Sequence, residues 1–281
     1  MKHSKDLKNE VDKGQLMIEK KSKFITNRDN DVSLLVVSCD AYKDLWRPFF
    51  HSLFKYWPDC PYPIFLGSNE SEYSDPRIKS ILVGPDKDYS SNLLAMLDRI
   101  ETPWLILWIE DLLLTSPINT ARLSNLIAVA QNHQAGYLKL SANTPWAFTN
   151  NWEQEMGPVP KGIKYRATIG ISLWNKDVLI RLLSPGESAW QMECNGSLRS
   201  NSFDEPFYCL STNVRSNPPL SFVNAVIKGL WNRNVLPFLK KEGLGDCIPN
   251  RPIQSFWSYL YTKMYLYRLD VYRRLRKYWY E

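Results

Sequence analysis

Short apolar runs dominate the first 111 residues of the chain, and polar or helical segments separate them. The runs are rich in β-branched, leucine and aromatic residues, which is typical of strands buried in a sheet. We expect such strands at residues 33–38, 63–67, 78–83 and 104–109.

Apolar residues at helical spacing follow the first run and precede the last one. The first helix has one apolar face, formed by Leu45, Phe49, Leu53 and Tyr56. Ser90 or Ser91 is expected to cap the second helix. Its apolar face comprises Leu93, Leu94, Leu97 and Ile100. Because strands that alternate with helices form βαβ units, the pattern predicts an α/β fold with a mainly parallel sheet.

The second half of the chain is less regular. Helices are expected at residues 123–130 and 177–183, and strands at residues 135–140, 169–174 and 220–227. Residues 141–166 are rich in Asn, Pro, Gly and Trp and predict one long loop, a kind of segment that is often functional. We therefore divide the chain into a mobile N-terminal arm (residues 1–31), one domain (residues 32–252) and a C-terminal helix (residues 253–281).

Composition narrows the class of protein without naming a function. A hydrophobic content of 44% is enough for a globular core, and the net charge of +6 favours an anionic partner or surface. Eleven tryptophans and fifteen tyrosines supply flat faces that suit sugar rings or a membrane interface. The five cysteines contain no CxxC pair, which argues against a zinc site or a disulfide framework. A cytoplasmic protein is expected, because no run is long enough to span a membrane and no apolar signal core begins the chain.

An acidic pair follows the most strand-like run of the sequence. Glu110 and Asp111 come directly after residues 104–109. In open α/β sheets, ligands bind beyond the carboxyl ends of the strands. Two carboxylates in that place suit a hard divalent cation and, through it, a diphosphate. The competing interpretation is that the acids only cap the segment that follows, since acids are common at helix starts.

Five short motifs give the chain a resemblance to a known family. In chain order they are residues 37–42 (VSCDAY), the Ser90 helix that leads into Ile109-Glu110-Asp111, and residues 170–174 (GISLW), 188–193 (SAWQME) and 228–231 (KGLW). Over residues 33–251 their order and spacing resemble a bacterial nucleotide-sugar glycosyltransferase of the GT-A type, of the kind that builds surface polysaccharides. The resemblance implies a GT-A-like (Rossmann-like) sheet that is mixed, mainly parallel and flanked by helices.

The resemblance also implies a site for the nucleotide-sugar donor. Ser38, Asp40, Ser90 and Lys228 would line this site, with Asp40 at the base or ribose and Lys228 at the phosphates. Gly229 after Lys228 would permit close approach of the backbone. For two of these residues a structural alternative remains open, because a lysine can be a solvated surface residue and an aspartate can cap a turn or helix.

A metal is implied at the acidic pair. Glu110 and Asp111 would hold Mg²⁺ or Mn²⁺, which would stabilise the charge that develops on the leaving diphosphate. The sequence departs from the usual Asp-x-Asp motif of the family, because Leu112 follows the pair. In addition, no histidine follows His133 to act as a further ligand. A metal-independent variant is therefore the alternative.

The acceptor side of the site is implied by two further motifs. Gly170 and Trp190 would contact a glycan or lipid-linked acceptor, and the Trp190 ring suits a sugar. Glu193 would be the general base, a role that typically contributes ~10²–10⁴-fold to the rate. Asp204 and Glu205 are fallback bases. A salt-bridged structural glutamate is the alternative for Glu193, and a retaining mechanism would need no base there.

The resulting expectation is an enzyme that transfers a sugar from a nucleotide donor to a glycan or lipid-linked acceptor. A nucleotidyltransferase is one alternative, although it would normally carry a Gly-rich basic loop after the first strand, where residues 38–42 have none. A non-catalytic glycan- or membrane-binding protein with the same fold is the other alternative, and it would bind no nucleotide.

The C-terminal segment is a separate signal. Apolar and aromatic residues recur at helical spacing from Leu260 to Tyr278. The segment carries six basic residues, Lys263, Arg268, Arg273, Arg274, Arg276 and Lys277. A basic amphipathic helix of this kind suits an anionic membrane surface, here the inner face of the cytoplasmic membrane. A structural helix packed on the domain is the alternative, and a nucleic acid is not an expected partner because no recognised motif for one is present.

Overall fold

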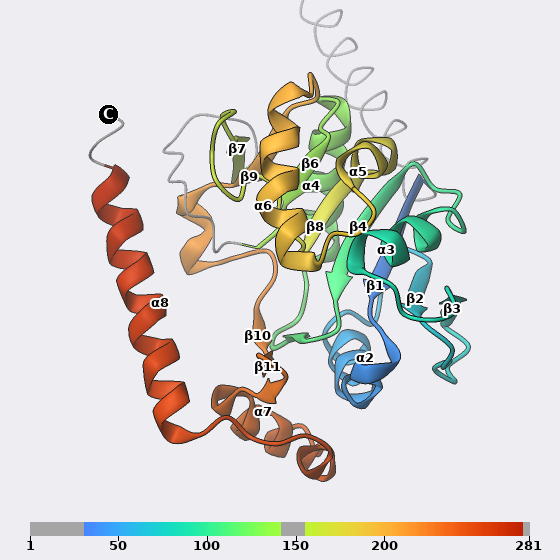
Figure 1. The fold of residues 1–281 in the computed structure, drawn as a ribbon, viewed down its shortest axis with the longest axis vertical. Helices are drawn as coiled ribbons and strands as arrows, with labels where there is room; N and C mark the ends of the chain where they lie inside the picture. The colour runs from blue at the N-terminus through green and yellow to red at the C-terminus, as the bar shows by residue number, and fades with distance from the viewer. Residues whose placement is uncertain (1–30, 142–154, 278–281) are drawn as a thin grey trace, which may run out of the picture.

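The computed structural model describes residues 31–141 and 155–277 (Figure 1). The expected N-terminal arm, except for Asp31, lies outside the described residues, as does much of the expected loop, residues 142–154. The helices are α2 (Trp46–Tyr56), α3 (Tyr89–Leu97), α4 (Thr120–Asn132), α5 (Lys176–Leu182), α6 (Ala189–Arg199), α7 (Leu236–Lys241) and α8 (Phe256–Lys277).

The strands are short and mostly buried. They are β1 (Val32–Val37), β2 (Ile64–Ser68), β3 (Ile78–Leu82), β4 (Trp104–Ile109), β5 (Leu112–Leu114), β6 (Tyr137–Lys139), β7 (Met156–Pro158), β8 (Ser172–Asn175), β9 (Phe207–Leu210), β10 (Phe222–Asn224), β11 (Val226–Ile227) and β12 (Leu230–Trp231).

Within the described residues, eight strands form one sheet in the order β3-β2-β1-β4-β8-β6-β9-β7. β1 pairs in parallel with both β2 and β4, and β2 pairs in parallel with β3. β8 is antiparallel to β4 and β6, and β7 is antiparallel to β9, whereas β6 and β9 are parallel. The sheet is therefore mixed but mainly parallel, which confirms the expected GT-A-like class.

Helices cover both faces of the sheet. Successive residues of a strand point to opposite sides, so β1 contributes side chains to two clusters. Leu34 and Val36 of β1 pack in one cluster with apolar residues of α2 and α4. Leu35 and Val37 pack in a second cluster with apolar residues of α3, α5 and α6. This double burial explains why the strand sequence is continuously apolar rather than alternating.

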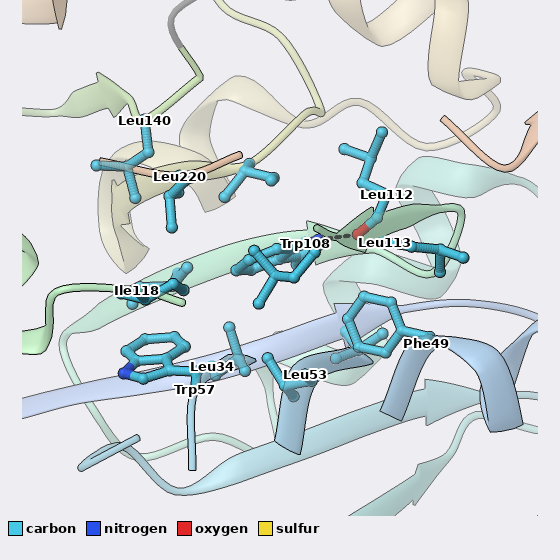
Figure 2. Close-up of a cluster of buried hydrophobic side chains, with 14 of the residues drawn as sticks. Leu34, Phe49, Leu53, Trp57, Trp108, Leu112, Leu113, Ile118, Leu140 and Leu220 are labelled. Atoms are coloured by element: carbon cyan, nitrogen blue, oxygen red, sulfur yellow. Dashed lines mark hydrogen bonds between the residues drawn. The ribbon is translucent and has the colours of Figure 1, made fainter. Parts of the chain in front are cut away.

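Trp108 joins β4 to the first of these clusters. Figure 2 shows its ring among Phe49, Leu34 and the leucines that follow the strand. Its Nε1 donates a hydrogen bond of 2.9 Å to the backbone oxygen of Leu112. The bond spans Glu110 and Asp111, so the core itself fixes the turn on which the acidic pair lies.

Three local predictions are corrected by the structure. Asp88, not Ser90 or Ser91, caps α3, because its side chain accepts a hydrogen bond from the Ser91 backbone N–H. The expected loop contains β7, which pairs with β9. The expected strand at residues 220–227 is divided into β10, which pairs with β5, and β11, which pairs with β12.

The predicted C-terminal helix is present as α8, which leaves the domain next to α7 in Figure 1. In the part of the chain that the structure describes, no helix is both long enough and apolar enough to cross a membrane.

Candidate functional site

A cavity of about 420 Å³ opens beyond the carboxyl ends of β1 and β4. These two strands are neighbours at the centre of the sheet, and the chain leaves β1 toward β2 on the other side. Such a reversal of strand order leaves a crevice, and ligands of open α/β sheets bind in crevices of this kind. The topology therefore marks this cavity as the candidate site before its residues are considered.

Four segments form most of the cavity wall, and Ile169 and Ala189 add to it. Ser38 and Cys39 follow β1, and Glu110 and Asp111 follow β4. The third segment is residues 86–92 at the start of α3. The fourth segment is the turn between β11 and β12. The lining residues from the last two segments are Asp86, Lys87, Asp88, Tyr89, Asn92, Lys228 and Gly229.

The acidic pair lines this cavity in a poorly hydrated setting. The Glu110 side chain is buried, and burial raises its pKa to about 8, with a further increase from the charge of Asp111. Burial likewise raises the pKa of Asp111 to about 6. The backbone oxygen of Asp111 accepts a 2.7 Å hydrogen bond from the Ala225 N–H, which ties the pair to the segment after β10.

The pair fits a divalent cation in its donor chemistry. Asp111 Oδ1 is buried and accepts no hydrogen bond from the described residues. A buried carboxylate oxygen without a partner is costly, and a cation would offset that cost. Across residues 31–141 and 155–277 no group of three His, Cys, Asp or Glu side chains is placed to hold a metal. A cation here would therefore take its remaining ligands from diphosphate oxygens and water.

Lys228 reaches the cavity from a tight hairpin turn. It and Gly229 are the two residues between β11 and β12, and their φ angles are 51° and 78°. Positive φ at both positions is the pattern of a type I′ turn, which glycine tolerates easily and lysine does not. A strained lysine at the mouth of a cavity is a feature that sequence spacing alone does not reveal.

Arg251 fastens this turn to the end of β1. Its guanidinium donates to both carboxylate oxygens of Asp44, at 2.9 and 2.6 Å, and to the backbone oxygen of Gly229 at 2.9 Å. It also lies over the ring of Tyr42, 4.6 Å from the ring centre. Its positive charge lowers the pKa of both Glu110 and Asp111, which opposes the effect of burial.

Tyr89 contributes a second buried polar atom to the cavity wall. Its hydroxyl has no hydrogen-bond partner among the described residues. Burial raises the pKa of Tyr89, and the charges of Glu193 and Glu110 raise it further. Tyr89 lines the cavity together with the acidic pair and with Ala189, the first residue of α6.

Among the predicted donor residues, Ser38 and Lys228 line the cavity, and Asp40 and Ser90 do not. The carboxylate of Asp40 accepts hydrogen bonds from the backbone N–H groups of Asn69 and Ser71 and from the Ser71 hydroxyl, at 2.8–3.0 Å. Burial raises the pKa of Asp40, but these hydrogen bonds together lower it below the usual aspartate value. Asp40 thus links the segments that follow β1 and β2 through hydrogen bonds.

Ser90 is buried in the first turn of α3, and its hydroxyl has no partner among the described residues. Its backbone N–H donates a 3.1 Å hydrogen bond to the Glu187 oxygen, which joins the start of α3 to the loop before α6. Ser90 therefore sits behind Tyr89 and Asn92, the neighbours that do line the cavity.

The predicted acceptor residues do not line the cavity, although Gly170 and Trp190 directly follow Ile169 and Ala189, which do. Glu193 is half-buried on α6, and its Oε1 accepts a 2.9 Å hydrogen bond from the N–H of Ile169, a residue of the cavity wall. Burial raises the pKa of Glu193. Gly170 follows Ile169, and a methyl group added there would meet no atom within 4 Å. Trp190 is 66% exposed at the start of α6.

The fallback bases are placed differently. Glu205 forms an ion pair with Arg181; burial raises the pKa of Glu205, but backbone hydrogen bonding and the Arg181 contact together lower it. Asp204 is exposed. Like Glu193, neither lines the cavity.

Sequence reasoning missed Tyr89, Lys87 and Arg251. Tyr89 and Lys87 are close in sequence to the predicted Ser90, and only the fold shows which of these neighbours face the cavity. Arg251 lies 207 residues from its partner Asp44, so no local pattern could have linked them.

Comparisons with known proteins give little at the level of sequence. No family model matches the chain, and no curated protein matches it. Among solved structures, Staphylococcus aureus TarS 1–349 is similar at 14% identity and a TM-score of 0.42, over 64% of this chain and 60% of that one. The same TarS fragment in complex with UDP-GlcNAc gives 14% identity and a TM-score of 0.41, over 64% and 58% of the two chains.

A cytidylyltransferase from Leptospira borgpetersenii serovar Hardjo-bovis is also similar, at 12% identity and a TM-score of 0.46. That match covers 80% of this chain and all of the other. The chain spans only about 60% of the TarS fragment it matches. At these values the likenesses do not select an activity, and the cavity is the feature of the molecule that bears on function.

Proposed function

We propose that the chain is a nucleotide-sugar-dependent glycosyltransferase that moves a sugar to a glycan or lipid-linked acceptor in cell-surface polysaccharide synthesis. One observation carries the proposal: a cavity at the strand-order reversal of the sheet is lined by the buried Glu110, the half-buried Asp111 and Lys228. A nucleoside diphosphate needs this combination of a crevice, a cation-binding carboxylate pair and a positive side chain.

The donor would bind with its diphosphate between the acidic pair and the β11–β12 turn. Glu110 and Asp111 would hold Mg²⁺ or Mn²⁺, and the cation would neutralise the charge of the leaving diphosphate. Lys228 would contact the same phosphates from the opposite wall, while Arg251 holds the turn in place through Gly229. Ser38 at the end of β1 would contact the nucleoside.

The acceptor would enter from the side of α6. There Glu193 would take the proton of the attacking hydroxyl, and Trp190 would offer its exposed ring to an acceptor sugar. A carboxyl whose pKa is raised by burial is a better proton acceptor than an ordinary one at neutral pH, provided it stays ionised. Gly170 would leave room beside the acceptor because it has no side chain.

Product analysis tests the proposal. The full chain is incubated with Mn²⁺ and a panel of nucleoside diphosphate sugars, with membrane lipid and glycan fractions as acceptors. The proposal expects release of nucleoside diphosphate together with glycosylated acceptor, and loss of both in Asp111→Asn. Release of pyrophosphate from a nucleoside triphosphate and a sugar phosphate would instead show a nucleotidyltransferase. Failure to bind any nucleotide would show a non-catalytic protein.

A further inference from the structure

The outer face of α8 carries an unusual share of the exposed apolar surface. Thirteen large hydrophobic side chains are exposed in the described residues, and eight of them lie on this one helix. They are Phe256, Trp257, Leu260, Tyr261, Met264, Tyr265, Tyr267 and Val271. Single exposed hydrophobic residues are ordinary, but a group of this size marks an interaction surface.

Hydrogen bonds to the domain show which side of α8 faces inward. The buried Gln254 donates from Nε2 to Ser258 Oγ at 3.3 Å and to Thr262 Oγ1 at 3.0 Å. Tyr259 Oη donates to Asn234 Oδ1 at 2.9 Å. The side with Ser258, Tyr259 and Thr262 is therefore turned to the domain.

The apolar residues lie on the opposite side of the helix. Leu260, Met264, Tyr267 and Val271 follow one another at spacings of four, three and four residues, which places them on one stripe. Their exposed fractions range from 37% to 72%. We call these four residues the α8 stripe. It has no cover within the described chain.

Charge identifies the partner of this stripe. The sequence of α8 contains six basic residues and one acidic residue, Asp270. Lys263 and Arg268 lie within one residue of the stripe members Met264 and Tyr267, and the other four basic residues occupy the last turns, residues 273–277. A second copy of the helix, in either direction, would bring basic residues together with almost no acids to pair them. An anionic surface would satisfy them instead.

We propose that α8 docks on the surface of a bilayer that contains anionic lipids. The α8 stripe enters the boundary between headgroups and acyl chains, the tyrosines and Trp257 lie at the polar–apolar interface, and the basic residues contact the headgroups. The inference stands on α8 alone and does not depend on the proposed function. It also gives a physical reason for exposing aromatic residues that a soluble helix would bury.

Co-sedimentation of the full chain with vesicles tests this proposal. The probes are vesicles of phosphatidylcholine alone and vesicles that also contain phosphatidylglycerol. We expect binding to the anionic vesicles only, and weaker binding at high salt because salt shortens the Debye length below its value of about 8 Å at physiological ionic strength. Binding to neither kind of vesicle, or equal binding to both, would overturn the proposal.

Paired variants separate the contribution of the basic residues on α8 from the effect of the protein's overall net charge. Lys263→Glu/Arg268→Glu should lower vesicle partitioning at least about 30-fold, since each basic residue near an anionic surface contributes about fivefold. Lys161→Glu/Lys164→Glu makes the same change elsewhere and should leave partitioning nearly unchanged. In each of these pairs one lysine stacks on a neighbouring tyrosine, so the two pairs are closely matched. Equal losses in both pairs would contradict a role for α8.

A second pair of variants tests the α8 stripe. Met264→Ser should weaken binding to anionic vesicles, whereas Leu198→Ser, at a still more exposed position on α6, should not. Melting temperatures of all variants show that they are folded. If Met264→Ser instead abolishes a concentration-dependent dimer and vesicle binding is absent, the α8 stripe is an interface between two copies of the chain, and the proposal fails.

Discussion

The carboxylate of Glu193 is less stable when ionised in the folded protein, and it is also the proposed general base. It accepts one hydrogen bond from Ile169, and burial raises its pKa, so its ionised form is less stable in the folded protein than in water. A carboxyl whose pKa is raised on folding favours the folded state when protonated, and this contribution is lost as the pH rises through its folded pKa. A neutral side chain of the same shape avoids that loss.

Glu193→Gln should therefore raise the melting temperature at neutral pH, because glutamine stays neutral and its oxygen can still accept the Ile169 N–H. The gain should shrink as the pH falls toward the ordinary glutamate pKa of about 4.3, where Glu193 becomes protonated. The same variant should lower turnover at least ~10²-fold while donor binding is kept.

Melting curves across a pH series, with the exposed Glu72→Gln as control, check the stability part. Parental turnover in Glu193→Gln would transfer the role of base to another group or favour a retaining mechanism.

Among the secondary-structure elements, the β11–β12 turn holds a lysine in a strained backbone conformation at the wall of the cavity. Lys228 has a φ of 51°, a left-handed conformation that asparagine tolerates better than lysine. Lys228→Asn should leave the melting temperature unchanged or raise it slightly, and it should weaken nucleoside diphosphate binding by about tenfold or more, as expected for the loss of a charged phosphate contact.

Calorimetric titration of Lys228→Asn and of Lys43→Asn, at an exposed lysine outside the cavity wall, measures this effect. If the two variants bind nucleotide equally well, Lys228 is a solvated surface lysine.

The elements that sequence could predict are those with their own apolar signature. β1 and β4 are continuous apolar runs because both faces are covered, and α2 repeats its apolar residues at helical spacing. β7 could not be predicted in this way, because Met156–Pro158 is three residues long and is a strand only through pairing with β9. The cap of α3 was misplaced for a related reason, since several polar residues near its start could serve and only packing selects Asp88.

The residues of the candidate site likewise divide into those with a local sequence signal and those placed only by tertiary contacts. The acidic pair was found because it directly follows β4, whose carboxyl end lies at the edge of the sheet, whereas Lys228 was found through the short motif of residues 228–231 and belongs to a separate hairpin. Asp40 also follows a strand, yet its carboxylate is bound by the backbone of residues 69–71. Arg251 carries no local signal, because its role arises from contacts with residues about two hundred positions away.

At the scale of the whole molecule, α8 contributes little of its described surface to the core. Its first turns are attached through Gln254 and Asn234, and nearly all of its described side chains are exposed. Truncation after Ser255 should therefore lower the melting temperature by less than about 4 °C, the shift that ~1 kcal/mol produces in a domain of this size.

Scanning calorimetry of the truncated and full-length chains measures that shift. A loss much larger than this, or aggregation of the truncated chain, would show that α8 is a structural part of the domain.

If the cavity at the ends of β1 and β4 binds a nucleoside diphosphate through a cation held by Asp111, the bound nucleotide should stabilise the fold. Thermal unfolding with nucleoside diphosphates, with and without Mn²⁺, measures this stabilisation in the parent chain and in Asp111→Asn. A ligand at about 100 times its dissociation constant should stabilise the parent by about 2.7 kcal/mol. We predict this stabilisation only with Mn²⁺ present, and its loss in Asp111→Asn, which should remain folded. Equal stabilisation of both proteins, or of neither, would contradict the account.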